Sequence, residues 1–447
     1  MDFIAACRHL ISVDSTTEQG SMAMAHATAE LCRKAGLEVE LQAEFHSDLE
    51  EANVIARLPG AGKQNEIMFQ NHLDTVGPGI YTQWAKTQCN PFDAHIIDGY
   101  IHGLGAADVK CDLLCKLAAI SSFAGKKFKH PPVLVGTFGE GSGMMGALRL
   151  IRKSKVHAKW AVVAEASNLR LITAGLGYAK VEIRVPFSDA EQHYRVSHDL
   201  QESTSSQSKL FSGKAAHSSN PSLGESAIKK MLTYLSQLPE DLAIMQIEGG
   251  TTFNTVPAHA FVELDPVSGF KEPMARKLNI IYREILELED SFLKYPDSDF
   301  QPPYPTLNIG TVKTRIDHVY LSGICRITPS ISNEIYDQWM MKLHGACQKV
   351  GAELRVSDYK KPFRTEETSE LVSAAHAALV ELGLDPASKS QSSTSEASLF
   401  SRVGIECIAF GPGLREGNIH TPNERVSIED LKTTTAFYRR LIERLCL

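Results

Sequence analysis

The stretch PPVLVGTFGEGSGMMGA, residues 131–147, joins an apolar run to a glycine-rich loop that carries one carboxylate, Glu140. The run is typical of a short strand buried in a sheet, and helical spacing follows the loop. Strands that alternate with helices predict an α/β unit with a largely parallel sheet. In an open α/β sheet, functional residues gather beyond the carboxyl ends of the strands, where Glu140 is expected to lie.

The same alternation extends outward on both sides of this stretch. Helices are predicted at 3–13, 21–36, 112–125, 369–383 and 427–445, and strands at 37–45, 52–60, 65–74, 159–166 and 405–413. Between about 180 and 360 the pattern becomes α+β in style, and the polar segment 188–210 is expected to be a long loop or extended hairpin. We therefore expect an α/β fold in two parts, residues 1–180 and 361–447, with an inserted α+β domain at 181–360.

Composition limits the classes of function. The chain has 447 residues, 43% of them apolar and 22% charged, and these values are typical of a soluble globular protein. A net charge of −7 argues against a nucleic-acid partner, and no apolar run is long enough to span a membrane. Nine scattered cysteines suit a reducing compartment, and the N-terminus resembles an amphipathic helix more than a signal peptide. A cytoplasmic location is expected.

Five residues suggest a metal site. Four of them lie at or just after the carboxyl ends of predicted strands, and the fifth, in GLGAADVKCD, lies in a glycine-rich turn that opens a helix: His72, Glu140, Glu165, His420 and Asp108. Histidines and carboxylates that converge at one sheet edge are zinc-type ligands. One such residue would mean little, but five in this arrangement favour a metal site.

Four of these residues also have an ordinary structural explanation. His72 could end a strand, Asp108 could cap the following helix, Glu165 could be a surface acid and His420 could be a turn residue. Asp74 favours the metal interpretation, because a carboxylate near a ligating imidazole is the usual supporting arrangement.

Six motifs in order along the chain resemble one family. NHLDTV, GLGAADVK, GEGSGMMGA, AEAS, GKAAHSSNPSLGESAI and GPGLREGNIHTPNE are similar to the signatures of the zinc amidohydrolases and metallopeptidases, which include glutamate carboxypeptidase, acetylornithine deacetylase, succinyl-diaminopimelate desuccinylase, aminoacylase and tripeptidase. The resemblance covers most of the chain and is weakest at 187–208 and 259–304. It implies a dinuclear-metal catalytic domain, which would be the α/β part, and an inserted lid domain.

The resemblance also implies the metal ligands. His72 would bind one metal and His420 the other, and Asp108 would bridge both metals. Glu165 would bind the same metal as His72. Asp74 would orient His72. Two Zn²⁺ ions per subunit are expected, with Co²⁺ or Mn²⁺ as alternatives.

Other roles follow from the same resemblance. Glu140 would be the general base, and His217 would stabilise the oxyanion, often from the partner subunit of a homodimer formed through the lid domain. Arg326 and Asn254 would hold a substrate carboxylate. A surface salt bridge for Arg326 and a turn role before Pro257 for Asn254 remain alternatives.

The chain departs from the family pattern at Gly141. Family members usually have a second glutamate here, which binds the metal held with the His420 equivalent, and glycine has no side chain to replace it. The second metal site is therefore expected to be weakened. Gly141 could be an inactivating substitution, a natural variant that works with one firmly held metal, or the mark of a lineage that only binds.

The resulting hypothesis is a metal-dependent hydrolase that cleaves the amide bond of a small N-acyl or peptidyl amino acid with a free carboxylate. The alternative is a non-catalytic protein on the same fold that binds a small molecule or peptide at a degenerate metal site. A nucleotide-binding oxidoreductase is a third class, but GLGAAD lacks the full spaced-glycine fingerprint.

Overall fold

The computed structural model describes residues 2–46, 48–199, 206–218, 220–240, 242–267 and 269–447. The chain forms two compact units. Unit 1 comprises Met1–Ala174, Phe363–Ser390 and Ser395–Leu447, and unit 2 comprises Gly175–Pro362 and Gln391–Thr394. The short segment Gln391–Thr394 is held within unit 2 by Leu176, whose N–H donates to the Gln391 carbonyl at 3.2 Å and whose carbonyl accepts from Thr394 Oγ1 at 2.6 Å.

Unit 1 is built on a nine-stranded mixed sheet in the order β1-β2-β6-β3-β7-β20-β8-β18, with β19 beside β8. Its strands are β1 (Glu38–His46), β2 (Leu49–Arg57), β3 (Glu66–His72), β6 (Pro132–Thr137), β7 (Ala158–Ala164), β8 (Ile172–Gly175), β18 (Phe363–Arg364), β19 (Lys389–Gln391) and β20 (Glu406–Phe410). The four central strands β6, β3, β7 and β20 are parallel, whereas β1, β2 and β8 pair antiparallel with their neighbours. The carboxyl ends of the central strands therefore meet at one edge of the sheet.

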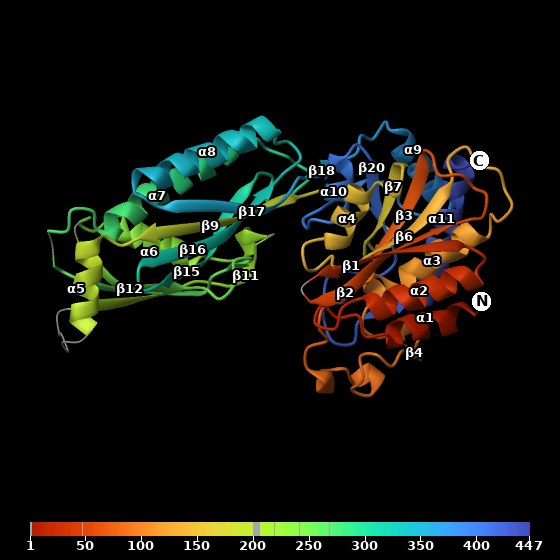
Figure 1. The fold of residues 1–447 in the computed structure, drawn as a ribbon, viewed down its shortest axis with the longest axis horizontal. Helices are drawn as coiled ribbons and strands as arrows, with labels where there is room; N and C mark the ends of the chain where they lie inside the picture. The colour runs from red at the N-terminus through yellow and green to blue at the C-terminus, as the bar shows by residue number, and fades with distance from the viewer. Residues whose placement is uncertain (1, 47, 200–205, 219, 241, 268) are drawn as a thin grey trace. The chain divides into compact units, whose positions relative to one another are not determined.

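Helices cover both faces of this sheet (Figure 1). One face packs against α1 (Phe3–Ser12), α2 (Met22–Lys34), α3 (Cys111–Ser121), α9 (Glu370–Glu381) and α11 (Ile428–Leu445), and the other packs against α4 (Met145–Lys153) and α10 (Ala397–Arg402). Neighbouring strand residues point to opposite faces, so Phe69 joins the first core and Met68 the second. A small sheet of β4 (His95–Ile97), β5 (Tyr100–His102) and β21 (Arg425–Ser427), and short helical turns at Tyr81–Gln83, Ala85–Thr87 and Ala106–Lys110, complete the unit.

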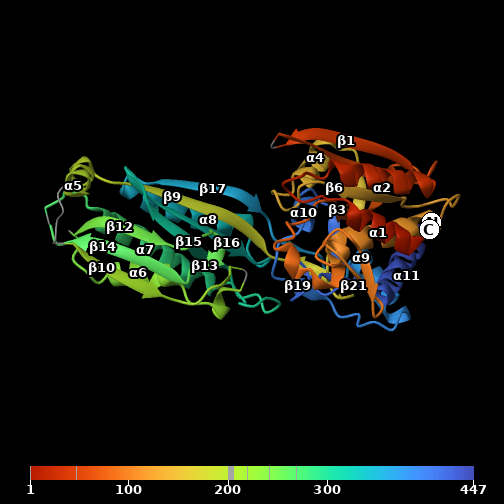
Figure 2. The same ribbon diagram turned by 90° about the horizontal axis from the view of Figure 1, so that it is seen from below.

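Unit 2 is an antiparallel sheet with helices packed against one face (Figure 2). The strand order is β10-β14-β12-β15-β16-β9-β17. The strands are β9 (Gly177–Pro186), β10 (Gln207–Ser212), β12 (Ala243–Gly249), β14 (His259–Asp265), β15 (Thr306–Thr314), β16 (His318–Ile327) and β17 (Glu353–Lys360). The helices α6 (Ala227–Leu235), α7 (Met274–Phe292) and α8 (Asn333–Lys349) share one hydrophobic core with the sheet. A two-stranded ribbon of β11 (Ala216–His217) and β13 (Thr255–Val256) and a turn at Pro221–Leu223 lie outside this sheet.

The structure corrects the expectation for the polar segment 188–210. Residues Asp189–Asp199 form helix α5, and Gln207–Ser212 form strand β10, while residues 200–205 lie outside the described part of the chain. Glu191 explains part of the difference, because this buried side chain accepts a hydrogen bond from the backbone N–H of Met274 at 2.9 Å. Such a tertiary contact is not visible in the local composition.

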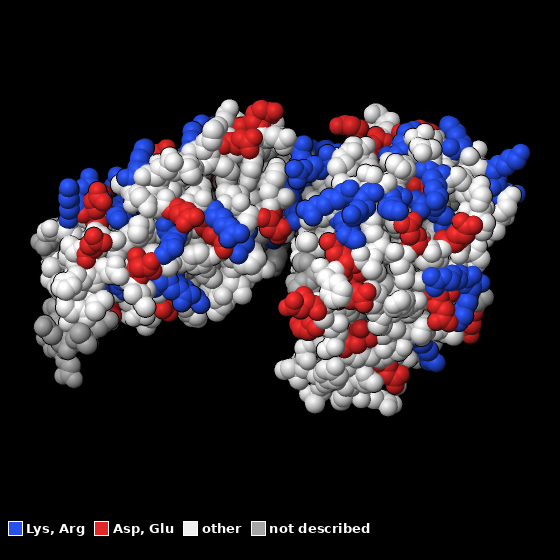
Figure 3. All heavy atoms as spheres, viewed as in Figure 1, with Lys and Arg blue, Asp and Glu red and all other residues white. Residues whose placement is uncertain are grey.

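Positive and negative side chains are both spread over the visible face of each unit (Figure 3). In the parts of the chain that the structure describes, we find no helix with the length and apolar character needed to cross a bilayer.

Candidate metal centre

The parallel strands of unit 1 place the predicted site residues at one sheet edge. His72 is the last residue of β3 and pairs in register with Thr137, the last residue of β6. Glu140 follows β6 by three residues, and Glu165 directly follows β7. The loop after β20 carries His420. Four residues that are distant in sequence therefore share one edge because their strands are parallel neighbours.

Asp108 lies between the two histidines. Its Oδ2 is 2.8 Å from Nε2 of His420, and its Oδ1 is 3.6 Å from Nε2 of His72. Burial by itself would raise the pKa of Asp108, but the contacts from His420 and His72 outweigh it and lower the pKa. The carboxylate raises the pKa of His420 in return. Each oxygen of one carboxylate thus faces a different imidazole.

Asp74 organises the loop that carries Glu140. Its Oδ1 accepts the backbone N–H of Glu140 at 2.9 Å, and its Oδ2 accepts the N–H of Gly141 at 3.0 Å. His72 Nδ1 lies 3.0 Å from the backbone carbonyl of Asp74 and 4.0 Å from its carboxylate. The Asp74 backbone is therefore the nearer partner of His72, and the side chain holds the Glu140 loop.

Glu140 has a strongly perturbed environment. Burial raises the pKa of its carboxyl to about 7, and the nearby carboxylates Asp74 and Asp108 add to the rise while His72 opposes it. A carboxyl with a pKa near neutrality can both accept and release a proton at physiological pH. This property suits the role of general base that the resemblance implies.

Gly141 has room for a side chain. A Cβ at this position would meet only Oδ2 of Asp74, at 3.6 Å, which is ordinary van der Waals contact. The neighbouring Gly139 is different, since its φ of +64° favours glycine. The backbone at 141 therefore does not require glycine.

Two residues that the sequence analysis did not single out contact the predicted ligands. Nη2 of Arg415 forms an ion pair with Oε2 of Glu165. Buried Glu424 accepts the backbone N–H groups of Gly105 at 3.1 Å, Ala107 at 2.8 Å and Asp108 at 3.0 Å. Glu424 thereby ties the loop of His420 to the turn of Asp108. In the sequence, only its position four residues after His420 indicated that Glu424 could lie near the site.

The donor set fits a metal, although the side chains contact one another. Among the described residues, no three His, Cys, Asp or Glu side chains surround a common point as ligands. However, Asp108 presents one oxygen to each imidazole, and Glu165 lies beside them at the same sheet edge. Imidazole and carboxylate donors on both sides of a shared carboxylate are the chemistry expected of a two-metal site.

Unit 2 brings together the three predicted lid residues. The backbone carbonyl of Asn254 accepts the N–H of Ser218, next to His217, at 2.9 Å. The Ser218 hydroxyl lies 3.3 Å from Nη2 of Arg326, and the Arg326 guanidinium lies 5.5 Å from the ring centroid of Tyr178. Burial, together with the charge of Arg326, lowers the pKa of His217. These contacts form one polar cluster within unit 2.

Arg326 is a buried cation. Its residue is 8% exposed, its Nε has no hydrogen-bond partner, and no carboxylate among the described residues forms an ion pair with it. Burial lowers its pKa to about 10, which still leaves it charged at neutral pH. A buried guanidinium without a carboxylate partner is well suited to binding an anionic ligand.

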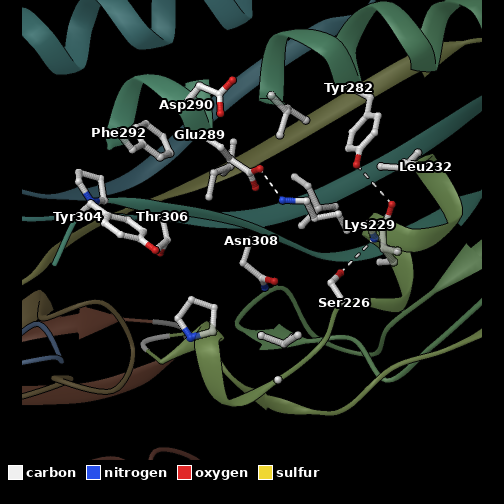
Figure 4. Close-up of a pocket in the computed structure, with 18 of the residues that line it drawn as sticks. Ser226, Lys229, Leu232, Tyr282, Glu289, Asp290, Phe292, Tyr304, Thr306 and Asn308 are labelled. Atoms are coloured by element: carbon white, nitrogen blue, oxygen red, sulfur yellow. Dashed lines mark hydrogen bonds and ion pairs between the residues drawn. The ribbon is translucent and has the colours of Figure 1, made fainter. Parts of the chain in front are cut away.

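A separate cavity of about 440 Å³ lies in unit 2 between α6, α7 and the start of β15 (Figure 4). Lys229 and Glu289 form an ion pair at 2.5 Å there, and Asn308 Nδ2 donates to the Thr255 carbonyl at 3.1 Å. None of the predicted site residues lines this cavity.

Comparison with known proteins gives matches over most of the chain. The sequence model described as Peptidase family M20/M25/M40 matches residues 68–444. An acetylornithine deacetylase from Myxococcus xanthus is 23% identical over 463 residues, which cover 99% of this chain and 97% of that protein. A succinyl-diaminopimelate desuccinylase from Methylococcus capsulatus is 23% identical over 385 residues, covering 85% and 83% of the two chains.

Solved structures show the same fold. An aminoacylhistidine dipeptidase from Vibrio alginolyticus matches with a TM-score of 0.68 and 15% identity, covering 99% of this chain and 96% of that one. An M20 family metallo-carboxypeptidase from Sulfolobus solfataricus matches with a TM-score of 0.62 and 18% identity, covering 100% and 99%. At these identities the structural matches concern the fold and not the substrate.

Proposed function

Because the chain belongs to peptidase family M20/M25/M40 and is an enzyme of the metallopeptidase and amidohydrolase type, we propose that it hydrolyses the amide bond of a small N-acyl or peptidyl amino acid that carries a free carboxylate. The observation that carries this proposal is the position of Asp108 between His72 and His420, with Glu140 nearby. Such an arrangement combines a shared metal-binding carboxylate with a candidate base.

His72, Asp108 and Glu165 would hold one metal, and Asp108 and His420 would hold the other. Zinc is the proposed metal, with cobalt or manganese as alternatives. When bound, the metals supply Lewis acidity that polarises the amide carbonyl and lowers the pKa of water.

Side chains of the protein transfer the proton, position the base and stabilise the oxyanion. Glu140 accepts the proton of the attacking water and delivers it to the leaving amine nitrogen. Asp74 holds the Glu140 loop through two backbone N–H groups, which limits the movement of the base. His217 donates a hydrogen bond to the developing oxyanion.

Arg326 supports the choice of substrate. A free carboxylate would give the buried guanidinium the anionic partner that it lacks among the described residues. The proposed role of Asn254, close to Ser218 and Arg326, is to orient the same carboxylate.

We propose a homodimer formed through unit 2 and a cytoplasmic location. Strand β10 is at the edge of the sheet and has Leu210 77% exposed, so a partner strand or surface could cover it. All nine cysteines are free, which suits a reducing compartment.

Gly141 makes a direct test available. The chain and its Gly141→Glu variant are compared with zinc and a panel of N-acyl amino acids and dipeptides, and the released amine is measured. Activity in the variant alone would show a hydrolase with an impaired second metal site, whereas activity in both would show that one firmly held metal is enough. Inactivity of both proteins, with metal bound, would contradict the proposed substrate class and favour a binding role.

A further inference from the structure

A fully buried ion pair lies in α3, directly after the turn that carries Asp108. Asp112 and Lys116 are one helical turn apart, with side chains 0% exposed and Nζ 3.0 Å from Oδ2. Removing two charges from water costs several kcal/mol per ion, and an apolar pair of similar size is often as stable. Stability alone is therefore a weak explanation for the presence of this buried ion pair. Its other contacts suggest a different role.

The first contact leads to the segment of His72. Lys116 Nζ donates to the backbone carbonyl of Gln70 at 2.6 Å, and Asn71 Nδ2 donates to Asp112 Oδ2 at 3.1 Å. Both partners immediately precede His72, at the end of β3. The ion pair thus contacts the strand just before the first proposed metal ligand.

The second contact leads to Asp108. Asn71 Nδ2 also lies 3.1 Å from the carbonyl of Val109, the residue that follows Asp108. One buried amide therefore connects the strand of His72 with the turn of Asp108 and with Asp112. Asn71 itself is 0% exposed, so water does not compete for these bonds.

The third contact leads toward His420. The Tyr438 hydroxyl lies 2.8 Å from Asp112 Oδ1 and 3.1 Å from the carbonyl of Phe410, the last residue of β20. The loop that begins after Phe410 carries His420. Tyr438 belongs to α11, which packs beside α3 (Figure 1).

We propose that Asn71, Asp112, Lys116 and Tyr438, here called the Asp112 network, are positioning residues that align the three ligand-bearing segments for metal binding. The inference rests on the proposed roles of His72, Asp108 and His420 as ligands. A buried polar network favours one arrangement of the segments that it joins, and each of these four side chains forms at least one hydrogen bond, although Oδ1 of Asn71 has no partner. Loss of one member should therefore weaken metal binding by more than the loss of an equivalent hydroxyl elsewhere.

Tyr438→Phe tests this proposal, because it removes only a hydroxyl and that hydroxyl touches no proposed ligand. Tyr336→Phe is the matched control, since Tyr336 is also buried but its hydroxyl has no hydrogen-bond partner. Zinc affinity is measured by competition with a chromogenic chelator, and stability is measured by urea unfolding of the metal-free proteins. We expect Tyr438→Phe to weaken zinc binding about 10-fold and Tyr336→Phe to leave it unchanged.

A second variant tests the same proposal in case Tyr438→Phe does not fold correctly. Asn71→Ser should weaken zinc binding to a similar extent, and the double variant should lose less than the product of the two effects, because both act through Asp112. Unchanged zinc affinity in folded Tyr438→Phe and Asn71→Ser proteins would overturn the proposal.

His72→Ala distinguishes this failure from a failure of the proposed function. If the unaltered chain binds zinc and His72→Ala does not, the proposed site stands whatever the Asp112 network does. If zinc binding is the same with and without His72, the proposed ligand set is wrong, and the inference fails with it.

Discussion

The carboxylate of Asp74 accepts the backbone N–H of Gly141 at 3.0 Å, so Gly141 is held by its main chain. The same carboxylate holds the N–H of Glu140 at 2.9 Å. Because these bonds involve the main chain and not the side chain at 141, a substitution at 141 does not remove either of them.

Asp74→Asn should lower turnover about 10- to 100-fold, a range typical of residues that support metal ligands. Asparagine keeps the size of the side chain, but it has one acceptor oxygen for two N–H groups and no charge. Turnover and zinc affinity are measured together, with Asp93→Asn, an exposed aspartate that pairs with His95, as the control. Equal turnover and equal zinc affinity of Asp74→Asn and Asp93→Asn would show that the contacts of Asp74 with the Glu140 loop do not support activity.

Glu140→Gln should reduce turnover about 10²- to 10⁴-fold, because an amide cannot act as a general base. Metal content should stay the same, since Glu140 is not a proposed ligand. The base is active when ionised, and its pKa is raised to about 7, so activity of the unaltered chain should rise with pH through neutrality. A Glu140→Gln protein that retains the rate and pH profile of the unaltered chain would exclude Glu140 as the base.

Parallel strand order made much of the site predictable from sequence. His72 ends an apolar strand, Glu140 and Glu165 each follow one, and parallel neighbours place such residues at one edge. Arg415 and Glu424 could not be placed in the same way, because their partners are defined by loop conformations. Glu424, for example, binds N–H groups more than 300 residues earlier in the chain.

Helix α5 and the Asp112 network show a second limit of sequence analysis. The polar composition of 188–210 suggests a loop, but Glu191 is buried against Met274. Asp112 and Lys116 have the spacing of an exposed helical pair, and only the packing of α3 shows that both are buried. Charged residues in the interior are recognisable once their distant partners are known.

Arg326→Met should lower kcat/KM about 10- to 100-fold for substrates with a free carboxylate, because a hydrogen bond to a charged group contributes about 1.5–3 kcal/mol. When the carboxylate of these substrates is converted to an amide, kcat/KM should be low for the unaltered chain. The Arg326→Met substitution should lower it little further. Arg355→Met, which changes an exposed arginine on β17, is the control. An equal loss with acid and amide substrates would argue against carboxylate recognition.

His217→Ala should reduce turnover about 10²- to 10³-fold without changing zinc affinity, as expected for the loss of one oxyanion donor. If the donor acts across a homodimer, mixing His217→Ala with Glu140→Gln protein should restore about a quarter of the activity, since half of the dimers are mixed and each has one complete site. Full turnover of His217→Ala would remove its catalytic role. No recovery on mixing would assign His217 to the site of its own chain.

Glu396 predicts how stability depends on pH. This buried residue accepts a hydrogen bond from Thr137 Oγ1 at 2.9 Å, and its Oε1 has no partner. Burial raises its pKa from 4.5 to about 8, and the charge of Glu140 adds to the rise. Between these two values the folded state retains a proton that the unfolded state has lost, so the stabilising effect of protonation is complete below about 4.5 and is lost as pH rises to about 8.

The free energy of unfolding of the metal-free protein should therefore include a term that falls by about 1.4 kcal/mol per pH unit across this range. Glu396→Gln resembles the protonated acid and should flatten the dependence. Urea unfolding with a chelator at pH 5, 6, 7 and 8 measures this slope, and Glu38→Gln, an exposed substitution, is the control. Identical slopes for Glu396→Gln and the unaltered chain would show that Glu396 does not titrate in this way.

The segment Gln391–Thr394 belongs to unit 2 although the chain on both sides of it belongs to unit 1. A gene fragment for 175–362 would therefore encode unit 2 without these four residues, and the N–H and carbonyl of Leu176 would lose the Gln391 carbonyl and the Thr394 hydroxyl as partners. A deletion that joins Ala174 to Phe363 would leave those four residues inserted in unit 1 without Leu176, to which they are hydrogen-bonded. Exchange of unit 2 between relatives by recombination consequently requires two separate pieces of coding sequence to move together.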